Sequence, residues 1–186
     1  MLRVLAAFVL VTGMAAWPGG VQANEEAAWE ALRNGGVAII RHARAPGTGD
    51  PSNFRLGDCT TQRNLSQTGR DQSRRLGDRF REEGVDVGAA LHSRWCRARD
   101  TAELAFPDAA APEPALDSFF QNRSRSDAQT RATREIVAGW DGPGALVLVT
   151  HQVNVTALTG VFPREGEVVV IEPANEGVAV VGRIRP

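Results

Sequence analysis

Two histidines, each following an apolar run, are the residues of this chain best suited to carry chemistry. Arg41 and His42 directly follow the run 36–40, and His151 follows the run 146–149 after one threonine. Such runs are typical of buried strands in a parallel sheet, and ligands bind at the carboxyl ends of those strands in open α/β folds. The two histidines are therefore predicted to converge on one pocket, which Arg41 would make attractive to anions.

Helical and strand patterns alternate around these two runs. Helices are predicted over 25–33, 65–83, 97–106, 127–140 and 153–158, and strands over 37–40, 85–91, 146–149, 168–171 and 178–181. A turn-forming segment separates the last two strands, which is typical of a hairpin. The order predicts an α/β fold: a three-layer α/β/α sandwich with a mainly parallel central sheet and a C-terminal β-hairpin.

The beginning of the chain is typical of an export signal. Residues 4–16 are apolar, and the segment 21–23 that ends at Ala23 has small residues where a signal peptidase requires them. A Trp-Pro-Gly-Gly break makes the run shorter than the roughly 20 residues of a membrane span. We expect cleavage near Ala23, a single domain over 24–186 without a transmembrane segment, and a periplasmic or secreted location. Asn24 is expected to cap the first helix.

Local groups of arginine are more informative about possible ligands than the overall charge of the chain. The formal net charge is −1 at pH 7, so no nucleic-acid partner is expected. The polar segments 62–64 and 121–125 both contain arginine. They could contact a large anionic substrate, or they could be ordinary surface charge.

The long segment 43–64 is predicted to be a functional loop. It is rich in Gly, Pro, Asp, Asn and Thr, and a loop of this length inside a compact domain usually serves a site. It contains Cys59, and the only other cysteine is Cys96. In an oxidising compartment the pair could form a disulfide or remain two thiols, and two cysteines alone do not suggest zinc.

Four short motifs occur in a fixed order along the chain. They are Arg-His-Ala at 41–43, Leu-Ser-Gln-Thr-Gly at 65–69, the segment Ser-x-x-x-Arg-Ala-x-x-Thr-Ala at 93–102, and His151 after its strand. Together they resemble the histidine phosphatase superfamily, which includes the cofactor-dependent phosphoglycerate mutases. Ala43 replaces the glycine of the first motif. The stretch 42–47 is similar to the exported lipopolysaccharide core heptose phosphate phosphatases.

The resemblance implies a metal-independent phosphomonoesterase that needs no cofactor and acts on a small phosphorylated substrate. His42 would attack phosphorus and form a phosphohistidine that water hydrolyses. Arg41 and Arg97 would bind the phosphate oxygens through their guanidinium forks. His151 would donate a hydrogen bond to the same phosphate.

Further roles follow from the same resemblance. Arg44 and Thr48 lie where the family places additional phosphate contacts, with a solvated arginine and a turn residue as the alternatives. The proton donor is harder to assign because Gln152 follows the second histidine, where some relatives have an acid. Asp117 is the candidate general acid, and Glu172 is the alternative.

Two other functions compete with an exported phosphomonoesterase. One is a non-catalytic protein that binds phosphorylated glycan or lipopolysaccharide, and the other is a protein phosphohistidine phosphatase. Retention of His42 favours an enzyme, since binding alone needs the arginines but no nucleophile. A mutase is disfavoured because phosphoglycerates are cytosolic and the chain carries an export signal.

Overall fold

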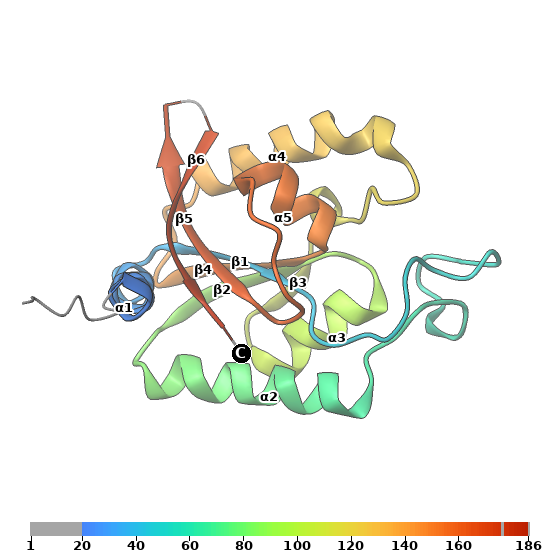
Figure 1. Ribbon diagram of the computed structural model, residues 1–186, viewed down its shortest axis with the longest axis horizontal. Coiled ribbons are helices and arrows are strands. Elements are labelled where there is room, and N and C mark those ends of the chain that lie inside the picture. Colours follow the sequence, from blue (N-terminus) through green and yellow to red (C-terminus); the bar gives the residue numbers. More distant parts are fainter. Residues whose placement is uncertain (1–19, 176, 186) are drawn as a thin grey trace, which may run out of the picture.

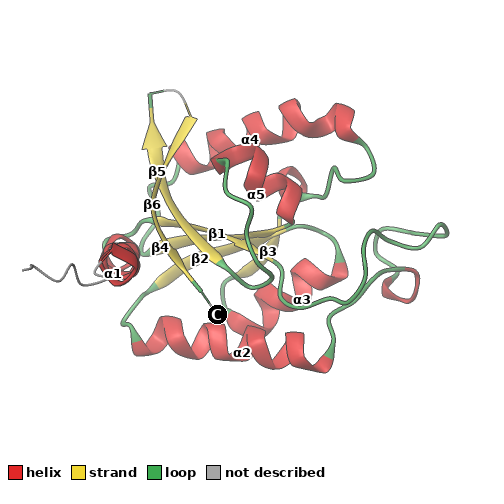
Figure 2. Cartoon of the chain, in the orientation of Figure 1, coloured by secondary structure: helices red, strands yellow, loops and turns green. Residues whose placement is uncertain are grey.

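A six-stranded sheet forms the centre of the computed structural model, which describes residues 20–175 and 177–185. The spatial order of the strands is β3-β2-β4-β1-β5-β6. Strand β1 pairs parallel with β4, β4 with β2 and β2 with β3, whereas β5 and β6 are antiparallel. The mainly parallel sheet and the terminal hairpin are therefore confirmed (Figure 2). The strands are β1 Val37–Arg41, β2 Val87–His92, β3 Ala110–Pro112, β4 Ala145–Thr150, β5 Val168–Ala174 and β6 Gly177–Ile184.

Helices cover both faces of this sheet (Figure 1). Alternate residues of β1 pack on opposite sides, with Ala38 and Ile40 in one core cluster and Val37 and Ile39 in the other. This alternation is the two-residue period of a strand buried on both faces. The first cluster is covered by α1 (Gly20–Arg33), α2 (Gln67–Glu82) and α3 (Cys96–Ala105), and the second by α4 (Ser126–Ala138) and α5 (Gln152–Thr159). The predicted three-layer sandwich is confirmed.

One local prediction was wrong, and one strand was missed. Asn24 does not cap α1, which begins at Gly20. Its side chain instead joins the helix to β6: Nδ2 donates to the carbonyl of Val181 at 3.3 Å, and Oδ1 accepts from the amide of Arg183 at 3.0 Å. Strand β3 was not predicted, because its three residues lie in an Ala/Pro-rich stretch without a strand pattern.

The predicted export signal lies outside the described residues, except for 20–23 at the start of α1. None of the helices between residue 20 and residue 185 that the structure describes has the length and apolar character needed to cross a membrane. The location of the protein thus stays a prediction.

The start of α2 packs tightly against the loop that leaves β1. The hydroxyl of Ser66 caps α2 by accepting from the amide of Gly69 at 3.1 Å. The carbonyl of Arg44 lies so close to Gly69 that an added Cβ would approach it to 2.2 Å. Glycine is required here by close contact between backbones, which fixes the chain two residues after His42.

A disulfide joins Cys59 to Cys96, with their Cα atoms 5.8 Å apart. It resolves the alternative that the sequence left open between a disulfide and two thiols. Cys96 is the first residue of α3 and directly precedes Arg97. The long loop after β1 is therefore covalently attached to the helix that carries a predicted phosphate ligand.

Candidate active site

His42 and His151 lie side by side at the carboxyl ends of two adjacent strands. Strands β1 and β4 are in register, with Arg41 opposite Thr150. The residue after each strand therefore reaches the same edge of the sheet. The two imidazole centroids are 5.5 Å apart, and both rings are almost fully buried.

The backbone fixes the tautomer of His42. Its Nδ1 lies 2.8 Å from the carbonyl oxygen of Ala43. A carbonyl can only accept, so Nδ1 carries the proton and Nε2 keeps its lone pair. Burial, followed by the positive charge of Arg97, holds the pKa of His42 well below its usual value. His42 is therefore a neutral ring with a free Nε2, which is the form that can act as a nucleophile.

His151 is held by a different contact. Its Nε2 lies 2.8 Å from the hydroxyl of Ser93, and its Nδ1 is buried with no hydrogen-bond partner among the described residues. Burial and the charge of Arg97 also hold the pKa of His151 well below its usual value. If Ser93 donates to Nε2, Nδ1 carries the ring proton and can be satisfied by a bound oxyanion.

Three arginines line a cavity of about 250 Å³ together with the two histidines. They are Arg41, Arg63 and Arg97. Nη1 of Arg41 donates to the carbonyl of Pro163 at 3.1 Å, and Nε of Arg63 donates to the carbonyl of Gly49 at 3.0 Å. Guanidinium groups held in place in this way suit the binding of a tetrahedral oxyanion with several negative oxygens.

Asp50 is the residue of this cavity that sequence reasoning missed. Its carboxylate accepts from Nη1 of Arg97 at 2.7 Å and from Nε1 of Trp95 at 3.0 Å. It also accepts from the amide of Arg63 at 3.1 Å. Burial alone would raise the pKa of Asp50, but the hydrogen bonds and charge of Arg97 outweigh it and the pKa is lowered. Asp50 is thus an anion that already occupies the fork of Arg97.

Asp117, the expected general acid, does not reach this cavity. Its side chain is 0 % exposed, and its carboxylate accepts from the amide and from Nε of Arg94, each at 2.9 Å. Its Oδ1 is 3.5 Å from the hydroxyl of Ser93, which contacts His151. This position does not fit direct protonation of a leaving group. The alternative, Glu172, is an exposed residue of β5.

Residues 37–143 match the Histidine phosphatase superfamily (branch 1). This chain belongs to that superfamily. No curated protein is significantly similar to it in sequence. The match includes β1, the long loop and α3, which together supply Arg41, His42, Asp50 and Arg97 to the cavity.

Solved structures share the histidine phosphatase fold of this chain. The protein histidine phosphatase SixA complexed with tungstate is 17% identical, with 81% of this chain and 96% of that chain covered and a TM-score of 0.55. Phosphoserine phosphatase from Entamoeba histolytica, in complex with 3-phosphoglyceric acid, is 11% identical, with 81% and 96% covered and a TM-score of 0.58. Phosphoglycerate mutase from Thermus thermophilus is 18% identical, with 81% and 98% covered and a TM-score of 0.53. Similarity at these identities shows the fold.

The two substrate contacts expected from the histidine phosphatase resemblance separate in space. Thr48 lines the cavity of His42. Arg44 lies in a different cavity, against α2. The reason is local: the amide of Arg44 donates to Oε1 of Gln72 at 3.0 Å, and its carbonyl accepts from the amide of Ser66 at 3.0 Å. These bonds hold the backbone of Arg44 against α2, and its side chain does not line the cavity of the two histidines.

Ala43 fits the position at which the histidine phosphatase motif has glycine. No described residue other than glycine has a positive φ, so Ala43 adopts an ordinary backbone conformation. Its amide donates to Oγ1 of Thr101 at 3.0 Å, and its methyl group packs with Ala45 and Leu65. The replacement therefore introduces no backbone strain.

Proposed function

We propose that this protein is a phosphomonoesterase that works through a phosphohistidine at His42. The observation that carries the proposal is a neutral histidine with a free Nε2 in a cavity lined by three arginines. A site that only bound phosphate would use the arginines and would gain nothing from a ring held in this tautomer. Membership of the superfamily supports the same chemistry.

The reaction would proceed in two displacements. Nε2 of His42 attacks phosphorus, so that an N–P bond forms while the P–O bond to the leaving group breaks. Water then attacks the phosphohistidine, which releases inorganic phosphate and restores neutral His42. Each step spreads negative charge over the equatorial oxygens, and Arg41, Arg63 and Arg97 would stabilise that charge.

Asp50 is the residue we propose for proton transfer, in place of Asp117. Of the residues described by the structure, it is the single carboxylate that lines the cavity. A phosphate that takes over the fork of Arg97 removes the main cationic partner of Asp50 and brings a negative group close to it. Both changes raise the pKa of a carboxyl group. Asp50 could then accept a proton from a monoanionic ester and deliver it to the departing oxygen.

We propose a phosphorylated sugar or lipopolysaccharide as the substrate and the periplasm or the exterior as the location, after cleavage near Ala23. Two exposed phenylalanines at the cavity, Phe120 (43%) and Phe162 (70%), support a substrate with a large non-phosphate part. Aromatic faces of this kind suit stacking against a sugar ring. Metal independence and the absence of a cofactor belong to the same proposal.

A protein phosphohistidine phosphatase is the second candidate. The observation that favours it is that the single carboxylate described in the cavity is already paired with Arg97. An imidazole is a better leaving group than an alkoxide, so a phosphohistidine substrate needs less help from an acid. A screen of phosphorylated sugars, heptose phosphates and phosphohistidine peptides separates the two candidates by their relative kcat/KM.

The test is a rapid quench in alkaline denaturant during turnover of a ³²P-labelled phosphate ester. The wild-type protein should yield a phosphoprotein that is labile to acid and stable to base, and His42→Ala should yield none. His92→Gln is the matched control, because His92 is also a buried histidine and does not line the cavity. A wild-type protein that turns over the ester without such a phosphoprotein would overturn the mechanism.

A further inference from the structure

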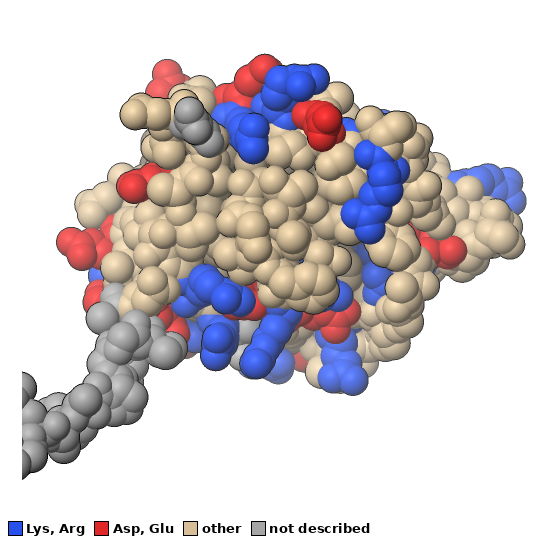
Figure 3. Space-filling model, turned by 45° about the horizontal axis from the view of Figure 1, so that its top comes forward, with Lys and Arg blue, Asp and Glu red and all other residues tan. Residues whose placement is uncertain are grey.

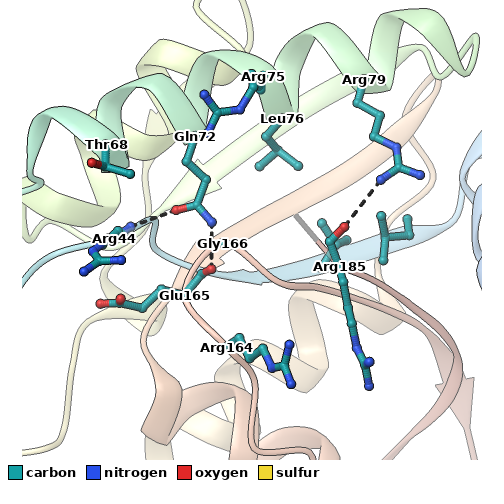
Figure 4. Close-up of a pocket in the computed structure, with 12 residues that line it drawn as sticks. Arg44, Thr68, Gln72, Arg75, Leu76, Arg79, Arg164, Glu165, Gly166 and Arg185 are labelled. Carbon is teal, nitrogen blue, oxygen red and sulfur yellow. Dashed lines mark hydrogen bonds between the residues drawn. The ribbon is translucent and has the colours of Figure 1, made fainter.

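A second cavity, of about 510 Å³, lies between α2, the loop before β5 and the end of β6 (Figure 4). Its size is that of a small-molecule site. Five arginines from these elements and from the loop after β1 surround it: Arg44, Arg75, Arg79, Arg164 and Arg185. None of the basic residues of the chain is a lysine. The guanidinium groups can therefore bind oxyanions in bidentate fashion.

The floor of this arginine-rich cavity is apolar. It consists of the buried side chains of Leu76, Val168 and Ile184. Figure 4 shows Leu76 pointing from α2 toward the strands, between Arg75 and Arg79. A simple phosphate site would not need such a floor, whereas an alkyl chain would bury against it.

Three of the five arginines of the cavity have no acidic partner among the described residues, whereas Arg79 pairs with Glu25 and Nε of Arg185 lies 4.0 Å from a carboxylate oxygen of Glu167. Within the part of the chain that the structure describes, no carboxylate lies within ion-pair distance of Arg44, Arg75 or Arg164. The one acid lining the cavity, Glu165, is engaged elsewhere: its Oε1 lies 3.6 Å from Nη2 of Arg41 and accepts from the amide of Ala45 at 3.1 Å. Exposed arginine is a general feature of this surface, since several basic side chains gather along the lower edge of the face in Figure 3. A test of the cavity therefore needs control arginines outside it.

The walls of the cavity are connected by hydrogen bonds within the protein. Gln72 bridges them: its Oε1 accepts from the amide of Arg44 at 3.0 Å, and its Nε2 donates to the carbonyl of Glu165 at 2.8 Å. Gly166 has a φ of +77°, and an added Cβ would lie 2.3 Å from Nε2 of Gln72. The cavity is therefore preformed, which lowers the entropic cost of binding.

We propose that this cavity binds an anionic amphiphile, with its head group among the arginines and its alkyl chain on the floor of Leu76, Val168 and Ile184. Charge complementarity selects the head group, and the apolar floor selects the chain. The Arg41–Glu165 ion pair connects this cavity to that of His42. The proposal goes beyond the phosphatase activity and does not depend on it.

Titration calorimetry with decyl sulfate below its micelle concentration tests the proposal. The probe is not a phosphate ester, so turnover does not interfere. Wild-type protein should bind it, and the double variant R75Q/R164Q should bind it about tenfold or more weakly. The matched control is R74Q/R81Q, since both arginines are exposed residues of α2 that do not line the cavity and make only local surface pairs. His42→Ala should bind as wild type does.

Several results would overturn the proposal. If decyl maltoside binds as tightly as decyl sulfate, the charge of the head group is irrelevant. If sodium sulfate binds as tightly as decyl sulfate, the apolar floor is irrelevant. Equal losses in R74Q/R81Q would indicate unspecific attraction. Binding that is lost in Arg97→Gln and kept in R75Q/R164Q would place the probe in the cavity of His42, because Arg97 lines only that cavity of the two. If R75Q/R164Q does not fold, R44Q/R185Q at other positions of the rim provides the same test.

Discussion

The two terminal nitrogens of Arg97 donate to the two carboxylate oxygens of Asp50, at 2.7 Å and 3.2 Å, and both side chains are only 4% exposed. This is the bidentate geometry that a guanidinium makes with a phosphate. Asp50 therefore holds Arg97 in place. A substrate phosphate must compete with Asp50 for the same nitrogens.

Asp50→Asn should separate substrates by their leaving groups. We expect kcat for an alkyl phosphate to fall by roughly 100-fold, because proton transfer contributes about that much. For nitrophenyl phosphate, whose leaving group needs no acid, kcat should change only a few-fold. Inhibition by inorganic phosphate should strengthen, because a neutral amide competes less well for Arg97. Steady-state kinetics with both esters measures these effects, and an equal loss of kcat on both would exclude Asp50 as proton donor.

Asp117→Asn provides the contrast, because Asp117 is buried against Arg94 and lies outside the cavity. Its effect on kcat should be similar for both esters, and its main consequence should be a lower melting temperature. Loss of one partner of a buried ion pair typically costs about 3–5 kcal/mol, and exposure of Arg94 reduces the expected cost below that range. A strong preference of this variant for nitrophenyl phosphate would restore Asp117 as the acid.

Acidification should destabilise the folded protein through the two buried histidines. Their folded pKa values lie well below the usual value, whereas in the unfolded chain they titrate near about 6.5. Their contribution to stability is complete above that pH. It is lost as the pH falls, by up to about 1.4 kcal/mol per pH unit for each histidine.

Urea unfolding at several pH values between neutrality and the carboxylate range measures this loss. His42→Asn should have a smaller pH dependence than the wild type, because one of the two groups has been removed. A free energy of unfolding that stays constant across this interval would show that the histidines are not held neutral.

Reduction of the Cys59–Cys96 disulfide should weaken both stability and substrate binding. The bond closes a segment with a sequence separation of 37, and constraints on loops of this size contribute about 3–4 kcal/mol. The long loop after β1, which Cys59 attaches to α3, carries Asp50 and Arg63 into the cavity. We expect dithiothreitol or the variant C59S/C96S to lower the melting temperature and to raise KM. No change in either quantity would contradict this link.

Ser93→Ala should impair turnover without changing the charge of the site. The hydroxyl of Ser93 lies 2.8 Å from Nε2 of His151 and is fully buried. Its loss leaves that nitrogen unpaired and the ring free to turn, so kcat should fall by roughly tenfold. Ser93→Thr keeps a hydroxyl and should recover part of the loss. Equal kcat in wild type and Ser93→Ala would show that the hydroxyl does not position His151.

The elements that place the histidines could be predicted because apolar runs are local signals. These signals are enough to assign the residues after β1 and β4 to one edge of the sheet. Asp50 was missed because it lies in an irregular loop, where no periodicity says which way a side chain turns. Its position depends on contacts with Trp95 and Arg97, which are distant in sequence.

Arg44 and Asp117 show a second limit of sequence reasoning. Both lie within a few residues of cavity residues, yet backbone bonds to α2 and an ion pair with Arg94 direct them elsewhere. Sequence proximity to a motif is a weak guide to the direction of a side chain. The arginine-rich cavity was also missed, since its residues come from four separate segments.

The in-register pairing of β1 with β4 has a consequence for folding. His42 and His151 belong to segments separated by most of the domain, and parallel pairing of such segments closes a long loop, which is slow. The imidazole rings of His42 and His151 come together only when the two segments pair. Recovery of activity during refolding should therefore report the docking of these two central strands, later than the formation of the helices between them.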